Sequence, residues 1–106
     1  MDFINELKRE KWFGDVYMND WLYFQNGYAI SIQASLAHAC LPKRTFKTLT
    51  NYTAFEVAVM KDGEPINVSK LKGMKWVAKK YSADTILEYV EKEDVNKIIK
   101  RISGEI

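Results

Sequence analysis

The alternation of apolar and polar side chains is clearest in the first third of the chain. Two runs of aromatic and β-branched residues, 21–24 and 28–32, flank an Asn-Gly dipeptide at 26–27. Asn-Gly readily adopts the positive φ angles of a two-residue hairpin turn, so this stretch predicts a β-hairpin. A two-residue loop would pair Tyr23 with Ile30 and place both side chains on one bulky, apolar face.

A second alternation predicts a third strand over residues 52–60. Phe, Val and Val occupy every second position of 55–59, while smaller or polar side chains occupy the positions between them. Residues 61–64 then form a turn in which glycine supplies a permissive backbone. Residues 65–68 fit a short edge strand, because proline is tolerated at the first position of such a strand.

A period of three to four residues replaces the alternation at both ends of the chain. Residues 91–103 begin with acidic side chains and end with basic ones, and Gly104 follows them, which favours a helix. Residues 2–11 predict a short helix with Asp2 as its cap. The two apolar stripes are formed by Phe3, Ile4 and Leu7 and by Val95, Ile98, Ile99 and Ile102.

These elements predict one domain over residues 1–106 with an α+β fold. We expect a small antiparallel sheet of three to four strands, with the C-terminal helix packed on one face and a short N-terminal helix. A hairpin alone is marginal in water, so the sheet needs the third strand and the covering helix for stability.

Composition excludes some classes of protein. The chain has 106 residues and a formal net charge of +2, which is too small to indicate a nucleic-acid partner by itself. Cys40 is the single cysteine, so an intramolecular disulfide cannot form, which favours a reducing cytoplasm. We expect no membrane contact, because no apolar run approaches the ~20 residues that span a bilayer and the start lacks a signal-peptide pattern.

Positive charge is concentrated in two segments. Residues 35–51 lack periodicity and acidic side chains, which predicts a long basic loop. Residues 69–83 interleave five lysines with aromatic and apolar side chains, and both a helix and a strand fit this stretch. Lysines neutralise phosphates and aromatic rings stack on bases, so one interpretation is a macromolecular binding surface. Lys43, Arg44 and Lys47 could join residues 69–83 in this one basic surface. A solvated face with core-facing aromatics, neutralised by the acidic segment 84–94, is the other.

The candidate binding residues are Lys43, Arg44, Lys47, Lys70, Lys72, Lys75, Trp76, Lys79, Lys80 and Tyr81.

Candidate catalytic or metal-binding groups are few. His38 and Cys40 could ligate zinc or form a catalytic pair, but a zinc site needs about four ligands and the chain has no second histidine or cysteine. Glu56 lies in an otherwise apolar strand, where it could be a perturbed carboxylate or the partner of a lysine. We expect no enzymatic activity, no cofactor and no metal, because phosphate-loop and nucleophile motifs are lacking. The carboxylate pairs, which are equally typical of turns and helix starts, are Asp62 with Glu64 and Glu88 with Glu91.

Three motifs follow one another in a distinctive order: Asn26-Gly27-Tyr28, Phe55-Glu56-Val57-Ala58-Val59, and Tyr89-Val90-x-x-Glu93-Asp94-Val95. This order resembles a diffuse set of small, uncharacterised proteins encoded by bacteriophages. The resemblance implies an α+β fold and a phage or prophage setting, and no catalytic residue carries over. The chain departs from that set in lacking a glycine-rich loop over 35–48 and in having Glu88 where the set has glycine.

We therefore expect a non-enzymatic phage or prophage accessory protein in the cytoplasm of a bacterial host cell. It would bind a host protein or ribonucleoprotein and inhibit a defence system such as a CRISPR–Cas effector, with a charged surface against an oppositely charged face of its partner. The alternative is a small nucleic-acid-binding protein that uses residues 69–83. A monomer and a homodimer are both compatible with the sequence.

Overall fold

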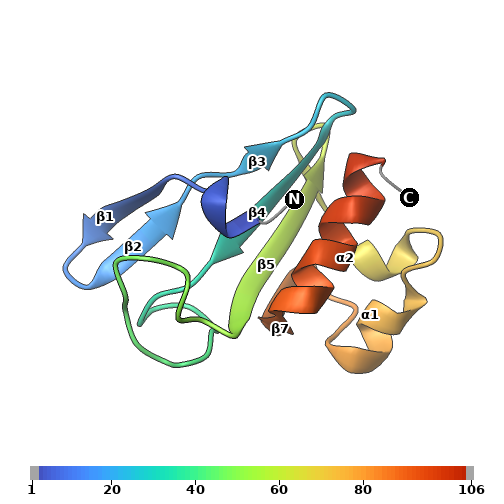
Figure 1. Ribbon diagram of the computed structural model, residues 1–106. Helices are drawn as coiled ribbons and strands as arrows, with labels where there is room; N and C mark the ends of the chain where they lie inside the picture. Colours follow the sequence, from blue (N-terminus) through green and yellow to red (C-terminus); the bar gives the residue numbers. More distant parts are fainter. Residues whose placement is uncertain (1–2, 105–106) are drawn as a thin grey trace.

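An antiparallel sheet with one helix against its inner face forms the centre of the molecule, as Figure 1 shows. The structure is a computed structural model that describes residues 3–104. The longest strand, β5, pairs with β4 along one edge, and β6 and β7 share its other edge; β3 pairs with β4. These strands are β3 (Leu22–Tyr23), β4 (Tyr28–Gln33), β5 (Ala54–Lys61), β6 (Glu64–Ile66) and β7 (Ile86–Glu91). The predicted α+β class with an antiparallel sheet is confirmed.

Helix α2 (Lys92–Ser103) lies where the C-terminal periodicity predicts it. Its apolar stripe packs on the sheet, because every residue of the stripe is buried. Gly104 ends the helix with a φ of 81°, and its N–H donates to the carbonyl of Lys100. This left-handed position favours glycine, which has no Cβ to clash with the backbone.

The core lies between α2 and the inner face of β4 and β5. Val57 pairs with Ile32 and Val59 with Ile30, and all four side chains are at most 1% exposed. Phe55 lies on the same face and meets the ring of Phe3 edge-on, at 5.2 Å between the ring centroids. The alternation in 55–59 therefore predicts the buried face of β5 correctly.

The β3–β4 hairpin has a register one residue away from the predicted one. Leu22 pairs with Ile30 and Tyr23 with Ala29, so the loop contains three residues, 25–27, instead of two. Gly27 has a φ of 90°, and its N–H donates to the carbonyl of Phe24, which is the geometry of a type I turn followed by a glycine bulge. The slip exchanges the two faces, so Leu22 points toward the core side and Tyr23 is 74% exposed.

The N-terminal helix predicted over 2–11 is wrong beyond its first turn. A 3₁₀ helix, η1 (Phe3–Asn5), is followed by a hairpin of β1 (Arg9–Phe13) and β2 (Val16–Asn19), which form a second sheet. The apolar stripe ends at Leu7, and no apolar residue continues it at helical spacing. Gly14, with a φ of 53°, is the first of two residues in the β1–β2 loop. Asp2, the expected cap, lies outside the described residues.

Strand β7 is absent from the prediction because a bulge hides its alternation. The pairing with β5 shifts register between Phe55 and Val57, and Tyr89 has a φ of 54°. Leu87 and Val90, three residues apart, are consequently both buried, which in the sequence looks like a helical spacing. Residues 3–104 thus contain seven strands in two sheets, in place of the predicted three to four.

The basic stretch 69–83 forms helix and not strand. A 3₁₀ helix, η2 (Val68–Lys70), leads into α1 (Lys75–Lys80), whose Val77 is fully buried. Residues 34–53 form the predicted irregular loop, joined to β5 by a bridge between Leu41 and Ala54. None of the helices in 3–104 has the length and apolar character needed to cross a lipid bilayer.

Candidate binding surfaces

Two neighbouring, highly exposed aromatic side chains lie on the β1–β2 hairpin, residues 9–19, which we call the arm. Trp12 and Phe13 are 74% and 75% exposed, and Met18 on the opposite strand is 37% exposed. The register shifts at Trp12, so this residue lies in a bulge. In Figure 1 the arm projects from the sheet on the side away from α1. Neighbouring exposed aromatics of this size are unusual on a monomer and are typical of a binding surface.

A side-chain amide joins the base of the arm to the main sheet. The amide of Gln33 accepts from the N–H of Asn19 at 2.7 Å and donates to its carbonyl at 2.7 Å, as a neighbouring strand would. The amide of Asn19 in turn donates to the carbonyl of Ile32 at 2.8 Å. Asn19 and Gln33 are both 4% exposed, so these hydrogen bonds are shielded from water.

Arg9 joins the arm to the irregular loop. Its guanidinium donates to the side chain of Asn19 at 3.1 Å and, through two nitrogens, to the carbonyl of Phe46 at 3.2 and 2.8 Å. The same group lies over the rings of Tyr17 and Tyr52, at 5.1 and 5.7 Å from their centroids. The one planar guanidinium of Arg9 therefore contacts side chains of the arm and both a carbonyl and a ring of the loop.

The tip of the arm is also attached. The hydroxyl of Thr45 donates to the carbonyl of Asp15 at 2.5 Å and accepts from the N–H of Leu36 at 2.8 Å. The loop therefore supports the arm at its tip, through Thr45, and at its base, through Arg9. The outward side chains of Trp12 and Phe13 are presented by a supported ribbon.

Two of the predicted binding residues, Lys80 and Tyr81, form an internal cluster with Asp94. The Lys80 ammonium lies 2.8 Å from Asp94 and 2.9 Å from Glu91. The hydroxyl of Tyr81 donates to Asp94 at 2.5 Å and accepts from the N–H of Glu91 at 3.0 Å. Asp94 also pairs with Lys97 at 3.5 Å, and its side chain is 3% exposed. The cluster joins α1 to the start of α2.

The protonation states in this cluster follow from these contacts. Burial alone would raise the pKa of Asp94, but the hydrogen bonds from Lys80 and Tyr81 outweigh it and bring the pKa below its usual range. Burial, with the hydrogen bond to Asp94, raises the pKa of Tyr81 to about 12. The hydrogen bonds to Asp94 and Glu91 raise the pKa of Lys80. At neutral pH the cluster is an ion pair with a neutral phenol.

Trp76 is also used within the protein. It packs against the core, and the ammonium of Lys97 lies 5.5 Å from its ring centroid. The remaining lysines of 69–83 point to solvent: Lys70, Lys72, Lys75 and Lys79 are exposed and form no ion pair within residues 3–104. The structure therefore divides the predicted residues of 69–83 into three that contact α2, which are Trp76, Lys80 and Tyr81, and four outward lysines.

The other basic segment, the loop that contains Lys43, Arg44 and Lys47, lies apart from α1. Figure 1 places the loop of residues 35–53 beside the arm and α1 on the far side of α2, so the two segments do not form one surface. Lys43 donates to the carbonyl of His38 at 2.7 Å, and the Arg44 guanidinium lies 5.8 Å from the ring centroid of Phe46. Lys47 is exposed.

The candidate catalytic or metal-binding side chains near the loop form hydrogen bonds that hold the loop in its conformation. Ser35 Oγ and His38 Nδ1 lie 2.7 Å apart, and the Cys40 thiol donates to the carbonyl of Ser35 at 3.3 Å. Glu56 accepts from the N–H of Ala39 at 3.2 Å. Burial lowers the pKa of His38 and raises the pKa of the fully buried Cys40 thiol, so both groups are neutral at pH 7. Across the described residues, no three His, Cys, Asp or Glu side chains are placed to hold a metal ion.

Comparison of the chain with protein-family models, with curated proteins and with solved structures finds no match.

The arm is the surface that the sequence analysis missed. Its signal is present in the chain: Gly14-Asp15 separates Lys11-Trp12-Phe13 from Val16-Tyr17-Met18, and a glycine-led two-residue loop between bulky runs is typical of a hairpin. The apolar stripe of Phe3, Ile4 and Leu7 instead favours a helix over 2–11, which overlaps the first three residues of β1.

The lowered pKa of Asp94 predicts a specific dependence of stability on pH. The ionised carboxylate stabilises the folded state fully above its unfolded pKa of about 3.9, and this contribution is lost as pH falls through the lower folded pKa. Asp94→Asn should therefore reduce the free energy of unfolding by about 1–2 kcal/mol at pH 7. The difference from wild type should shrink progressively as pH falls below about 4.

Urea denaturation at a series of pH values measures this difference. Glu93→Gln is the matched control, because Glu93 shares the first turn of α2 and is exposed. It removes a charge from the helix start without touching Lys80 or Tyr81. An Asp94→Asn effect that equals the Glu93→Gln effect, or that persists unchanged at pH 2, contradicts the assignment.

Proposed function

We propose that the protein is a non-enzymatic phage or prophage accessory protein that binds a host macromolecule and thereby inhibits a host defence system such as a CRISPR–Cas effector. The observation that supports this proposal is the arm, on which Trp12 and Phe13 are 74% and 75% exposed. The phage setting and the choice of a defence system rest on the resemblance of the hairpin, the β5 motif and the α2 motif to phage-encoded proteins.

Three properties make the arm suited to binding another protein. Trp12 and Phe13 are large and rigid, so burying them removes much apolar surface from water at a small cost in side-chain entropy. Their rings already lie 6.5 Å apart between centroids, in an edge-on arrangement. The arm is attached to the sheet by Asn19 and to the loop by Arg9 and Thr45, so little backbone order has to be gained on binding.

Truncation of the exposed rings tests the proposal. Trp12→Ala with Phe13→Ala should remove two binding anchors, each expected to contribute about 2 kcal/mol or more, which weakens the complex about 30-fold per ring. The readout is the efficiency of plaquing on a host whose CRISPR–Cas system targets the infecting phage. Wild-type protein should restore plaquing, and the double variant should lose that protection.

Tyr23→Ala is the matched control for this test. Tyr23 is 74% exposed, as Trp12 is, but it lies on β3 outside the arm. It should leave protection unchanged. Protection by the Trp12 and Phe13 variant equal to that of wild type, with circular dichroism confirming its fold, would remove the arm from the function. A wild-type protein that protects no phage from any defence system tested would overturn the proposal.

A second candidate function, nucleic-acid binding, is supported by the four outward lysines. Lys70, Lys72, Lys75 and Lys79 are free of ion pairs within the described chain, so their ammonium groups are available for phosphates. This candidate places the binding surface on η2, α1 and the turn between them, on the far side of α2 from the loop.

The salt dependence of single-stranded DNA binding tests this candidate. Lys75→Gln with Lys79→Gln should reduce the slope of log affinity against log salt by about 0.7 for each phosphate contact removed. Lys80→Gln is the control, since the Lys80 charge is already paired with Asp94 and Glu91. Fluorescence anisotropy of a labelled oligonucleotide supplies the affinities. Slopes that are equal in all three proteins, or the absence of binding, exclude this function.

A further inference from the structure

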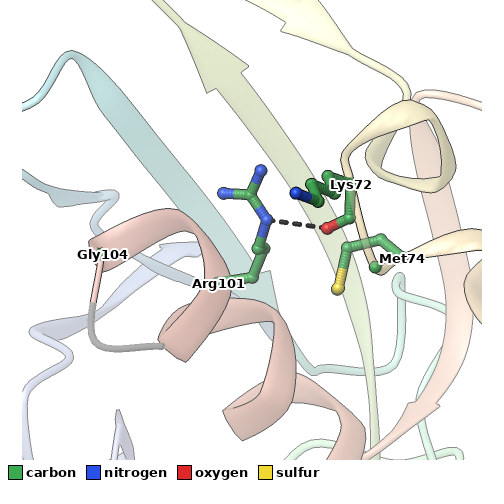
Figure 2. Close-up of a pocket in the computed structure, with 5 residues that line it drawn as sticks. Lys72, Met74, Arg101 and Gly104 are labelled. Carbon is green, nitrogen blue, oxygen red and sulfur yellow. Dashed lines mark hydrogen bonds between the residues drawn. The ribbon is translucent and has the colours of Figure 1, made fainter.

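A hollow of about 490 Å³ lies between the end of α2 and the turn that leads into α1. Its lining contains two cations, one apolar side chain and two glycines: Lys72, Arg101, Met74, Gly73 and Gly104. Figure 2 shows the side chains of Lys72 and Arg101 reaching the same space from the two elements. Among residues 3–104 no carboxylate belongs to this lining, so the described side chains around the hollow carry only positive charge.

The Arg101 side chain is fixed at one nitrogen and open at the other two. Its Nε donates to the carbonyl of Lys72 at 3.0 Å, and Figure 2 shows the terminal nitrogens directed away from that carbonyl. Neither terminal nitrogen has a hydrogen-bond partner within residues 3–104. A guanidinium oriented in this way presents a planar pair of donors, which matches two oxygens of one oxyanion.

The Lys72 ammonium is available to the same ligand. Lys72 is exposed and forms no ion pair among the described residues, while its carbonyl fixes Arg101. Two cations that converge on one space favour an anion carrying more than one negative charge over a single carboxylate.

The end of α2 opposes anion binding less than a bare helix terminus would. The negative end of a helix consists of its unpaired carbonyls. Here the carbonyl of Lys100 accepts from the N–H of Gly104 and from the hydroxyl of Ser103 at 3.3 Å, and the carbonyl of Ile102 accepts from Asn26 at 2.7 Å. Two carbonyls of the last turn are therefore already paired.

The rest of the lining suits an ester better than a bare ion. Met74 is 3% exposed and supplies an apolar wall next to the cations. Gly73 and Gly104 have no heavy atom within 4 Å of the position that a Cβ would take, so the backbone on both sides leaves open space. A phosphate with an organic substituent can contact the cations with its oxygens and Met74 with its apolar part.

We infer that Lys72 and Arg101 form a binding site for a phosphate group carried by an organic ester. The site is independent of the function proposed for the arm, because it lies on α2 and the turn before α1 and contains no residue of the arm. It shares Lys72 with the nucleic-acid-binding candidate, from which the mononucleotide probe distinguishes it.

The experiment follows the amide resonances of the full ¹⁵N-labelled chain during titration with three probes at constant ionic strength. The probes are inorganic phosphate, thymidine monophosphate and a short oligothymidylate. Gly73 and Gly104 should show the largest saturable shifts, and thymidine monophosphate should bind more tightly than inorganic phosphate. If only the oligonucleotide shifts these two resonances, the source of the phosphate is a polynucleotide and the site stands.

Variants separate the site from general positive charge. Lys72→Gln removes the ammonium but keeps the carbonyl that fixes Arg101, and Arg101→Lys keeps the charge but removes the paired donors. Each should weaken the tightest probe about tenfold or more, as expected for the loss of a charge-assisted hydrogen bond. Arg44→Gln removes a positive charge from the loop on the other side of α2, and it should leave the affinity for the probes unchanged.

The inference is overturned if none of the three probes gives saturable shifts at Gly73 and Gly104. It is also overturned if Lys72→Gln and Arg101→Lys bind as tightly as Arg44→Gln. The plaquing assay does not enter this test, so the phosphate site and the proposed function succeed or fail separately.

Discussion

The side chain of Gln33 completes the hydrogen bonding of a strand that leaves the sheet. Within residues 3–104 the edge of β2 that faces away from β1 has no neighbouring strand, so the backbone groups of Asn19 on that edge need another partner. The Gln33 amide supplies one donor and one acceptor at 2.7 Å each. Because unpaired buried backbone groups are strongly unfavourable, this pairing attaches the base of the arm to β4.

Contacts of polar and charged side chains also hold the opposite end of the molecule together. Three residues of α2 that share one side, Asp94, Lys97 and Arg101, contact the segment that contains α1. Their partners there are Lys80, Trp76 and the carbonyl of Lys72. These contacts hold a short helix that has only Val77 fully buried among its own residues. The lysines not needed for them remain on the outer surface, where they are free to meet another molecule.

The sequence predicts best where one periodicity persists and one face is buried. Strand β5 and helix α2 meet both conditions, because Val57 and Ile98 belong to long regular patterns and are fully buried. Strand β7 fails the first condition, since the bulge near Tyr89 interrupts its alternation. The hairpin at Gly27 shows a different limit: Asn-Gly fits loops of two and of three residues, and only packing against the core selects between them.

The candidate site, too, could be predicted only where residues close together in the sequence determine it. Local sequence identifies Lys80 and Tyr81 as members of a basic, aromatic segment, but their use depends on Asp94, which lies more than ten residues away. The prediction of one surface shared with residues 43–47 required their relative position across the whole sheet, which neither segment encodes locally. The arm depends on pairing between Asn19 and Gln33, and no short-range pattern indicates that contact.

The rigidity of the arm is the claim on which this account depends most, and ¹⁵N relaxation measures it directly. Backbone order parameters of residues 9–19 should be about 0.85, equal to those of β4 and β5, and should fall in Gln33→Leu but not in Gln25→Leu, whose glutamine lies in the exposed turn. Values below about 0.6 along the arm of the wild-type protein would contradict the account.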